Sequence, residues 1–270
     1  MSTPTLPDIV DLSLTLAPEL PSSWPGAVPF RHFVDHWFEE QEDASSIRLC
    51  GNGGPYRSHL ILLDEHTGTH FDAPAHFIPP AGSGLPAEGQ MGDVTGEKVL
   101  LSALRGRSRV VDLRSVELAG VGTSVRVDIA RIRDWESEHG PLVAGDVVLL
   151  LTGWDRKYGP GEPGKAYLYN PLVLRSEPAW PALTPDAVEY IESTGVRCIG
   201  TDAPSMGPAD DGAPTHVAGM SRGMVFVECL TNLDLIQHAE SVFMFAPVKI
   251  ARSAGGPGRA FAFLEQENTA

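Results

Sequence analysis

Five short runs of β-branched and aromatic residues limit most strongly what this chain can fold into. Each run has five to nine residues and is bounded by Gly, Pro or Asp, and the five runs are residues 109–113, 146–151, 196–200, 224–230 and 242–250. Runs of this length and composition indicate buried strands. The 28 Gly and 23 Pro residues, spread over 270 positions, predict short elements joined by many turns.

Two helices have clear end signals. Asp128 is placed to cap a helix that runs to Gly140, and Thr184 precedes Pro185 at the start of a second helix that stops at Gly195. Strands that alternate with helices predict an α/β fold with a mixed sheet and flanking helices. We see no internal repeat and no long linker, so residues 1–270 are interpreted as a single domain.

Two long segments lack a regular pattern, residues 78–98 and 153–181. Loops of this length in a compact domain are usually functional or disordered. The second segment is rich in aromatic residues, which favours an ordered role, as a lid or as a subunit contact, over a free tail.

One short stretch contains the main candidates for metal-binding and catalytic residues. In His66-Thr-Gly-Thr-His70-Phe-Asp72-Ala-Pro-Ala-His76 every polar candidate has an even number. Even positions share one face of an extended strand, so the intervening residues would pack the other way. Gly68 permits a bulge and Pro74 excludes the interior of a helix. Two imidazoles and a carboxylate are therefore expected to converge, with a third imidazole just beyond.

This ligand set suits a divalent metal. Two His and one Asp fit Zn²⁺, and also Mn²⁺ or Fe²⁺, and three protein ligands leave positions open for water. Such a metal would activate water and polarise a carbonyl group. His76 is the candidate for moving protons, as general base and acid. A cupin dioxygenase site would need a His-x-His pair, which the chain lacks.

A second pair of candidates lies far along the chain. Glu228 follows Met224 and Phe226 on one face of a predicted strand, where a carboxylate needs a partner or a metal. His216 lies twelve residues earlier. Asp202, just after another predicted strand, is interpreted as a turn residue, with a role behind the metal ligands as the alternative.

The remaining His and Cys residues are interpreted as structural. His32 and His36 lack a matching carboxylate, and the adjacent Trp37 and Phe38 indicate a packed or pocket-lining segment. Cys198 falls in a predicted buried strand. Cys229 should point away from Glu228, because neighbours on a strand face opposite sides.

Charge and cysteine content limit the possible partners and the cellular compartment of the protein. The net charge of −15 disfavours nucleic acid and anionic membranes as partners. Three widely spaced cysteines do not suggest a disulfide framework. No apolar run is long enough for a membrane helix, and the first residues do not resemble a secretion signal, so we expect a cytoplasmic protein.

The stretch from His66 to His76 resembles the signature of the cyclase family, which includes bacterial kynurenine formamidases and isatin hydrolases. The likeness extends along most of the chain: Ser23-Trp24-Pro25-Gly26 is similar to an N-terminal family segment, and Asp202-Ala-Pro-Ser to a family turn. The spacing of His216 and Glu228 matches that of kynurenine formamidases. Residues 246–250 and 256–260 are similar to the family's closing strand and Arg segment.

The resemblance implies a fold and a set of roles. The fold would be α/β, related to swivelling β/β/α domains, and the protein a homodimer or homotetramer. His66, His70 and Asp72 would hold a first metal ion, Zn²⁺ or Mn²⁺. Asp72 would bridge to a second ion on His216 and Glu228, although members with a single ion exist. Trp24 would line the substrate pocket.

A metal-dependent hydrolase is therefore predicted, acting on a small, ring-containing amide or ester: a cyclic amide, a lactone or an N-formyl arylamine. Two alternatives stay open. The same site could enolise a ketone in a non-hydrolytic cyclase or dehydratase, or the chain could be a non-catalytic metal-binding relative. The presence of His76 argues against the second alternative.

Overall fold

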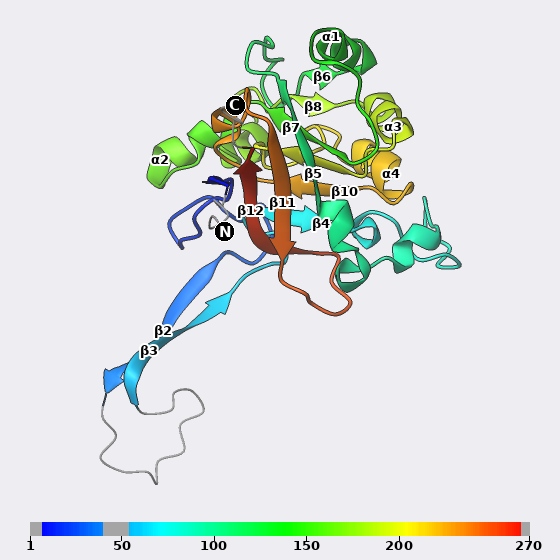
Figure 1. The fold of residues 1–270 in the computed structure, drawn as a ribbon. Coiled ribbons are helices and arrows are strands. Elements are labelled where there is room, and N and C mark those ends of the chain that lie inside the picture. The colour runs from blue at the N-terminus through cyan, green and yellow to red at the C-terminus, as the bar shows by residue number, and fades with distance from the viewer. Residues whose placement is uncertain (1–6, 40–53, 266–270) are drawn as a thin grey trace, which may run out of the picture.

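A curved eight-stranded mixed sheet forms the centre of the molecule (Figure 1). The computed structural model describes residues 7–39 and 54–265. The strand order is β1-β12-β11-β5-β7-β9-β10-β4, and β4 also pairs with β12. The sheet therefore curls until its last strand meets its second. The strands are β1 (Ile9–Asp11), β4 (His70–Asp72), β5 (Arg105–Asp112), β7 (Asp146–Leu151), β9 (Cys198–Thr201), β10 (Val225–Glu228), β11 (Ser241–Pro247) and β12 (Gly255–Leu264).

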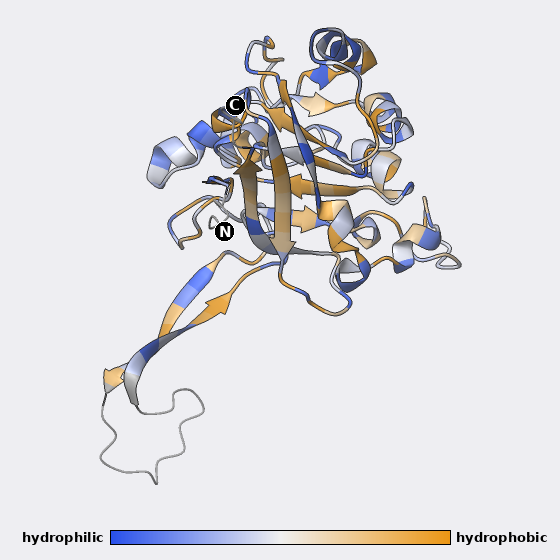
Figure 2. Ribbon diagram, viewed as in Figure 1, coloured by the Kyte–Doolittle hydropathy of each residue, from blue (hydrophilic) through white to orange (hydrophobic). Residues whose placement is uncertain are grey.

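The parallel strands β5, β7, β9 and β10 are the middle of this sheet. All six residues of β7 are buried. Val148 and Leu150 face one apolar cluster, whereas Val147, Leu149 and Leu151 face another. Alternate side chains of a strand point to opposite faces, so a continuous apolar run such as this one is buried on both sides. β7 and β10 are accordingly apolar in Figure 2, whereas the first half of β5, residues 105–109, is largely hydrophilic.

Besides the strands of this sheet, the described residues form four α-helices: α1 (Ile129–His139), α2 (Gly161–Gly164), α3 (Pro185–Ser193) and α4 (Ala213–Met220). Side chains of α1, α3 and α4 share the first cluster with the sheet. A small pair, β6 (Arg126–Val127) with β8 (Ala182–Leu183), precedes α1 and α3. None of the helices in the described ranges has the length and apolarity needed to cross a membrane.

The predicted elements are confirmed. All five apolar runs contain strands, and the mixed α/β fold class is as expected. Asp128 caps α1 by accepting a hydrogen bond from Arg131 N at 3.1 Å. Thr184 precedes α3, but its hydroxyl donates to Val127 O rather than capping the helix.

The two irregular segments are built from single turns of helix: η2 (Gln90–Asp93), η3 (Gly96–Lys98), η5 (Trp154–Lys157) and η6 (Asn170–Leu174), with η4 (Leu101–Leu104) and η7 (Leu233–Leu235) elsewhere. Trp154, Tyr167 and Trp180 are buried together in a third apolar cluster. Both indole N–H groups donate to backbone carbonyls, Trp154 to Tyr167 O and Trp180 to Gly207 O. Residues 153–181 are ordered, as expected, but these three side chains form core and not a lid.

A two-stranded arm extends away from the sheet (Figure 1). It consists of β2 (Arg31–Glu39) and β3 (Gly54–Leu62), paired antiparallel with two register shifts. Trp37 and Phe38, which the sequence places in a packed segment, are 52% and 57% exposed on it. That prediction is wrong for the single chain, because the arm extends away from both faces of the curved sheet.

Candidate metal centre

The centre is built on β4, the short strand that joins two edges of the curled sheet. His70 and Asp72 lie two residues apart on this strand, so both side chains point the same way, while Phe71 points into the core. In the antiparallel pairing with β10, Glu228 lies directly opposite His70. Strand register therefore brings His70 Nε2 to 3.6 Å from Glu228 Oε2, although 158 residues separate them in the sequence.

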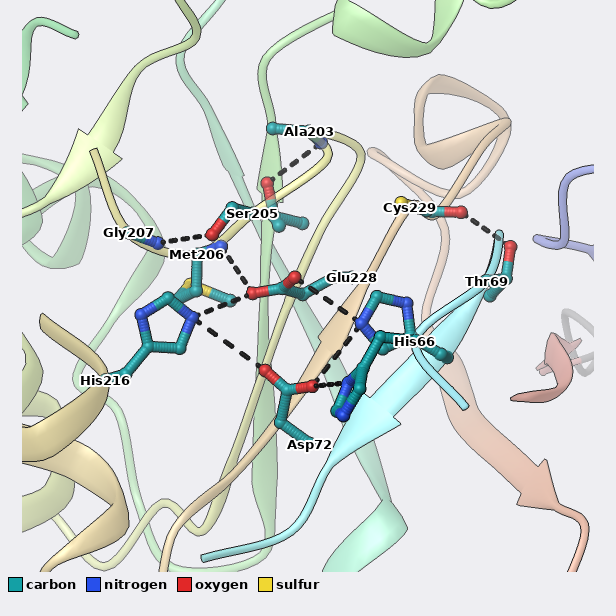
Figure 3. Close-up of polar contacts among 12 residues, drawn as sticks. His66, Thr69, Asp72, Ala203, Ser205, Met206, Gly207, His216, Glu228 and Cys229 are labelled. Carbon is teal, nitrogen blue, oxygen red and sulfur yellow. Dashed lines mark hydrogen bonds and ion pairs between the residues drawn. The ribbon is translucent and has the colours of Figure 1, made fainter. Parts of the chain in front are cut away.

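His216 enters from the opposite side, on α4. Its Nε2 lies 3.1 Å from Glu228 Oε1 and 3.8 Å from Asp72 Oδ2. Phe77 stacks on its ring with centroids 4.3 Å apart, and Phe226 contacts it edge-on. Figure 3 shows the two carboxylates between His216 on one side and His66 on the other.

His66 and His76 flank β4 without belonging to it. His66 lies in a turn before the strand, where Gly68 has a φ of +61°, and His76 ends the 3₁₀ turn η1 (Pro74–His76). The expectation of one extended strand from 66 to 76 is wrong, because the Gly68 turn and Pro74 restrict the strand to three residues. The turns nevertheless stack the two rings with centroids 3.9 Å apart.

A glycine at the start of β12 leaves room for the His66 ring. Gly255 lies opposite Asp72 in the β12–β4 pairing. A Cβ at this position would lie 2.2 Å from Phe71 O and 2.9 Å from His66 Cε1. Only glycine therefore fits between β4 and the His66 ring.

The protonation pattern of the imidazoles fits a cation. His70 Nδ1 lies 2.7 Å from Gly68 O and His216 Nδ1 lies 2.8 Å from Gly212 O. A carbonyl oxygen only accepts, so both Nδ1 atoms carry a hydrogen and both Nε2 atoms face carboxylate oxygens. Each Nε2–carboxylate contact needs a positive charge, either a proton on the ring or a metal cation between the two atoms, and backbone-anchored Nδ1–H groups are the usual arrangement behind metal-binding His.

The spacing of the ligand atoms also fits a metal. Five nitrogen–oxygen pairs among these residues lie 2.8–3.8 Å apart. Atoms that share one cation at about 2.1 Å are about 3.0–3.4 Å from each other. His66 faces Asp72 with Nδ1, while its buried Nε2 makes no hydrogen bond with the described residues and lies 3.7 Å from Glu65 Oε1.

Electrostatics at the centre favour positive charge. Against burial, which acts to lower them, hydrogen bonds and the charges of Asp72 and Glu228 raise the pKa of His70 and of His216. Burial acts to raise the pKa of Asp72, but the surrounding imidazoles hold it well below its usual range. Asp72 is therefore ionised at neutral pH and ready to bind a cation.

His76 has the opposite tendency. His76 is exposed to solvent on one side, but the desolvation of its ring by the surrounding cavity residues, together with the nearby rings of His66 and His216, lowers its pKa to about 4, against the opposing charge of Asp72. Its ring is therefore neutral at pH 7 and can accept a proton.

These residues form the floor of a cavity of about 390 Å³. All the residues singled out from the sequence line it: His66, His70, Asp72, His76, His216, Glu228 and Trp24. Trp24 is 40% exposed at the rim and contacts Trp180 edge-on. The structure thus brings the predicted set together.

Several cavity residues were not found from the sequence, among them Phe77, Tyr167 and Leu168. Phe77 was assigned to the opposite face, but η1 rotates it toward His216. Tyr167 and Leu168 come from the long segment 153–181, where aromatic content was the only signal.

The orientation predicted for Cys229 is wrong. β10 ends at Glu228, and Cys229 has a φ of +59°, which breaks the alternation of the strand. The residue lines the cavity beside His70 and Tyr167. Its carbonyl accepts a hydrogen bond from Thr69 Oγ1 at 2.6 Å, which ties it to the residue before β4.

Asp202 supports the centre from behind. Its buried carboxylate accepts hydrogen bonds from the N–H groups of Thr152 and Gly153 and from the Thr152 hydroxyl. It thereby joins the loops that follow β7 and β9. The turn that it begins delivers Met206 N, which donates to Glu228 Oε1 at 2.6 Å. Asp202 is thus a buried clamp and more than a turn residue.

Comparisons with known proteins agree with this arrangement. The model of the Cyclase family, described as "Putative cyclase", matches residues 10–208. The chain belongs to the cyclase family. The isatin hydrolase of Roseibium aggregatum is 32% identical over 217 residues, covering 78% of this chain and 76% of the relative. The kynurenine formamidase of Bacillus thuringiensis is 25% identical, covering 93% and 95%.

Solved structures match over nearly the whole chain. Isatin hydrolase A from Labrenzia aggregata, solved with benzyl benzoate bound, has a TM-score of 0.73 at 27% identity and covers 96% of this chain and 94% of its own. The resemblance inferred from the sequence and the family fold are confirmed. The relatives are hydrolases of carbon–nitrogen bonds other than peptide bonds, in line with the enzyme class predicted from the sequence.

Proposed function

We propose that this protein hydrolyses an amide or ester bond in a small ring-containing molecule, with Zn²⁺ or Mn²⁺ as cofactor. The observation that carries the proposal is the convergence of four imidazoles and two carboxylates on the floor of one cavity. A volume of about 390 Å³ suits a small substrate. The names of the relatives, isatin hydrolase and kynurenine formamidase, point to a cyclic amide or an N-formyl arylamine.

His66, His70 and Asp72 would hold the metal, with His216 and Glu228 completing the set or holding a second ion. The two oxygens of Asp72 face different imidazoles, Oδ1 toward His66 and His70 and Oδ2 toward His216, which supports a bridging role. A bound divalent cation would activate water and polarise the substrate carbonyl.

The other cavity residues bind the substrate and move its protons. Neutral His76 would take a proton from the attacking water and return it to the leaving nitrogen or oxygen. Trp24, Phe77 and Tyr167 present aromatic surface to a substrate ring. The apolar surface of this wall lowers the local dielectric and thereby strengthens the electrostatics of the floor.

The test compares metal-stripped and metal-loaded protein on isatin, a lactone and an N-formyl arylamine, in water labelled with ¹⁸O. We expect turnover only with metal, and label in the product acid. Equal rates with and without metal would reject the proposal, and a metal-dependent product without label would favour the non-hydrolytic cyclase.

Metal analysis decides the number of ions. If two ions bind, His216→Ala should halve the metal content per chain, whereas a single-ion centre would lose all or none of it. We also propose a cytoplasmic location, supported by the three widely spaced cysteines, of which Cys198 and Cys229 are free.

A further inference from the structure

A second cavity, of about 390 Å³, lies where the parallel strands begin. Its lining includes the first residue of each of these strands: Arg105 of β5, Asp146 of β7, Cys198 of β9 and Val225 of β10. None of the described residues lines both this cavity and the cavity of the metal centre. A molecule held here would therefore not contact the metal ligands.

Part of this lining is apolar. Cys198 and Val225 are each 1% exposed, and Pro74, also in the lining, is buried. Burial raises the pKa of the Cys198 thiol to about 12, so this side chain stays uncharged. Val99 and Leu100 add further apolar surface, and Leu100 is 73% exposed. A ligand with an apolar body would therefore be favoured, because it covers this surface from water.

Three exposed cations stand in the same lining: Lys98, Arg105 and Arg197. The Arg105 side chain makes no hydrogen bond and no ion pair with the described residues. Lys98 Nζ donates to a neutral group, the carbonyl oxygen of Asp93, at 2.7 Å. Arg197 forms an ion pair with Glu192. Within the described part of the chain, two of the three cations therefore lack an ion-pair partner.

The acidic side chain of this lining already has a partner. Asp146 is 4% exposed, and its carboxylate accepts hydrogen bonds from Arg107 Nε at 2.9 Å and Arg107 Nη2 at 3.1 Å. Its charge is therefore compensated by a residue outside the lining. The cations that remain give this cavity a positive surface on a chain whose net charge is −15. Such a surface is complementary to an anion.

We propose that this cavity binds a small carboxylic acid, whose apolar body lies against Cys198 and Val225 and whose carboxylate lies at Lys98 and Arg105. The inference goes beyond the proposed hydrolase activity and does not depend on it. A volume of about 390 Å³ suits a molecule with a single ring or a short hydrocarbon chain.

Arg105 is the residue that should contribute most to binding. A guanidinium group with unused N–H donors binds a carboxylate through two parallel hydrogen bonds, and the Lys98 ammonium adds a positive charge. The apolar part of the lining distinguishes ligands of equal charge, because an anion without an apolar body leaves it in contact with water. Tight binding therefore requires both parts of the ligand.

The test is calorimetric titration of the full-length, metal-loaded protein with benzoate. Benzamide has the shape of benzoate without its charge, and acetate has the charge without the ring. We expect benzamide and acetate to bind at least about tenfold more weakly than benzoate. Acetate or inorganic phosphate that binds as tightly as benzoate would show a general anion site and overturn the proposal.

Two variants and a matched control assign the binding to this cavity. Arg105→Gln removes the unpaired cation, and Ser102→Glu places a negative charge on an exposed residue of the lining. Each should raise the dissociation constant of benzoate at least about tenfold. Arg156→Gln makes the same change as Arg105→Gln at a side chain that is 64% exposed outside the lining, and it should bind benzoate as the wild type does.

Hydrogen exchange supplies a second readout that does not depend on a variant. Amides of residues 98–105 and 195–199 should exchange more slowly when benzoate is bound. Benzoate that slows exchange only at residues 66–77, which belong to the metal centre, would overturn the proposal, as would Arg105→Gln and Ser102→Glu proteins that bind benzoate like the wild type. Metal content and turnover without benzoate, measured on the same samples, report on the hydrolase proposal separately.

Discussion

The cavity floor and the β2–β3 arm depart from the usual distribution of side chains in opposite directions. At the floor, His70, Asp72, His216 and Glu228 are each 4% exposed or less, although all four are polar or charged. On the arm, Phe33 and Trp37 are more than half exposed, although both are aromatic. Burying ionisable groups and exposing large apolar groups are both unfavourable for a chain in water.

The difference shows what each region lacks. The floor presents lone pairs and negative charge toward one point, which a cation would neutralise. The arm presents apolar surface on two faces, since the neighbouring residues Phe33 and Val34 are both exposed, and only another apolar surface can cover it. Each region therefore indicates a missing component, and the two components are chemically distinct and can be removed one at a time.

The largest effect is expected from the floor. Asp72→Asn keeps the size of the side chain but removes the charge that faces three imidazoles. We expect metal content to fall sharply and kcat/KM to drop about 10³-fold or more, because the Lewis-acid contribution is several kcal/mol. Metal analysis and turnover on the best substrate measure both.

Asp11→Asn is the matched control for charge. Asp11 forms an ion pair with Arg259 at 2.6 Å, with both side chains substantially exposed. The same chemical change there should leave metal content and turnover as in the wild type, since exposed pairs contribute little. An active, metal-loaded Asp72→Asn protein would contradict the assignment of the centre.

A smaller loss is expected from replacing the proton-transferring imidazole of His76. His76→Ala should retain metal and lower kcat about 10²–10³-fold, since general acid–base catalysis contributes an amount of this order. Loss of metal together with activity would show instead that His76 is a ligand.

The pH profile sharpens this assignment. His76 accepts a proton only in its neutral form, and its pKa is lowered from 6.5 to about 4. For the metal-saturated wild type, kcat/KM should therefore hold its full value as the pH falls through 6.5 and decline only as it approaches about 4. A decline centred near 6.5 would contradict a His76 of this kind.

Chelation should separate the two regions. A metal that binds only the folded state at about 100 times its Kd stabilises it by about 2.7 kcal/mol. Removing the metal should therefore lower the Tm of the wild type and, by the same amount, that of Phe33→Ser/Leu60→Ser, a variant that removes one cross-strand apolar pair of the arm. The Tm of Asp72→Asn should not respond. A smaller shift in the arm variant would mean that the arm and the floor are coupled.

The sequence was sufficient where one local rule dominated. Residues 146–151 read as a strand because the run is apolar throughout, and it is buried on both faces. His70 and Asp72 share a face because they lie two apart on a strand. The placement of His216 and Glu228 beside them came from a family resemblance, since only strand register brings Glu228 opposite His70.

The sequence was insufficient where backbone geometry or a missing partner decided the outcome. Nothing in the residue type of Cys229 indicates its positive φ, which turns the side chain into the cavity. Pro74 excludes a helix interior, which the sequence predicts. The sequence does not predict that Pro74 begins a 3₁₀ turn, and this turn brings Phe77 against His216. Residue type shows that Trp37 and Phe38 are apolar, but it does not show whether the surface that covers them belongs to the same chain or to another.

The smallest expected effect concerns the buried hydroxyl of Tyr167, which, unlike the polar groups at the cavity floor, lacks a regular hydrogen-bond partner among the described residues. Tyr167 is 1% exposed, and burial raises its pKa well above the usual value, so the hydroxyl keeps its hydrogen. It lies beside Cys229 Sγ, a weak acceptor, and makes no regular hydrogen bond with the described residues. Tyr167→Phe should therefore leave the free energy of unfolding unchanged or raise it by about 1 kcal/mol.

Tyr158→Phe gives the matched comparison, because Tyr158 donates to Thr15 O at 2.8 Å and its loss should lower the free energy of unfolding by about 1 kcal/mol. If the Tyr167 hydroxyl instead donates to a polar atom of the bound substrate, Tyr167→Phe should raise KM by about three- to tenfold with metal content intact. A Tyr167→Phe protein that is destabilised as much as Tyr158→Phe, with an unchanged KM, would contradict both expectations. The Tyr167 hydroxyl would then stabilise the folded core, and this wall of the cavity would contact the substrate only through aromatic surface.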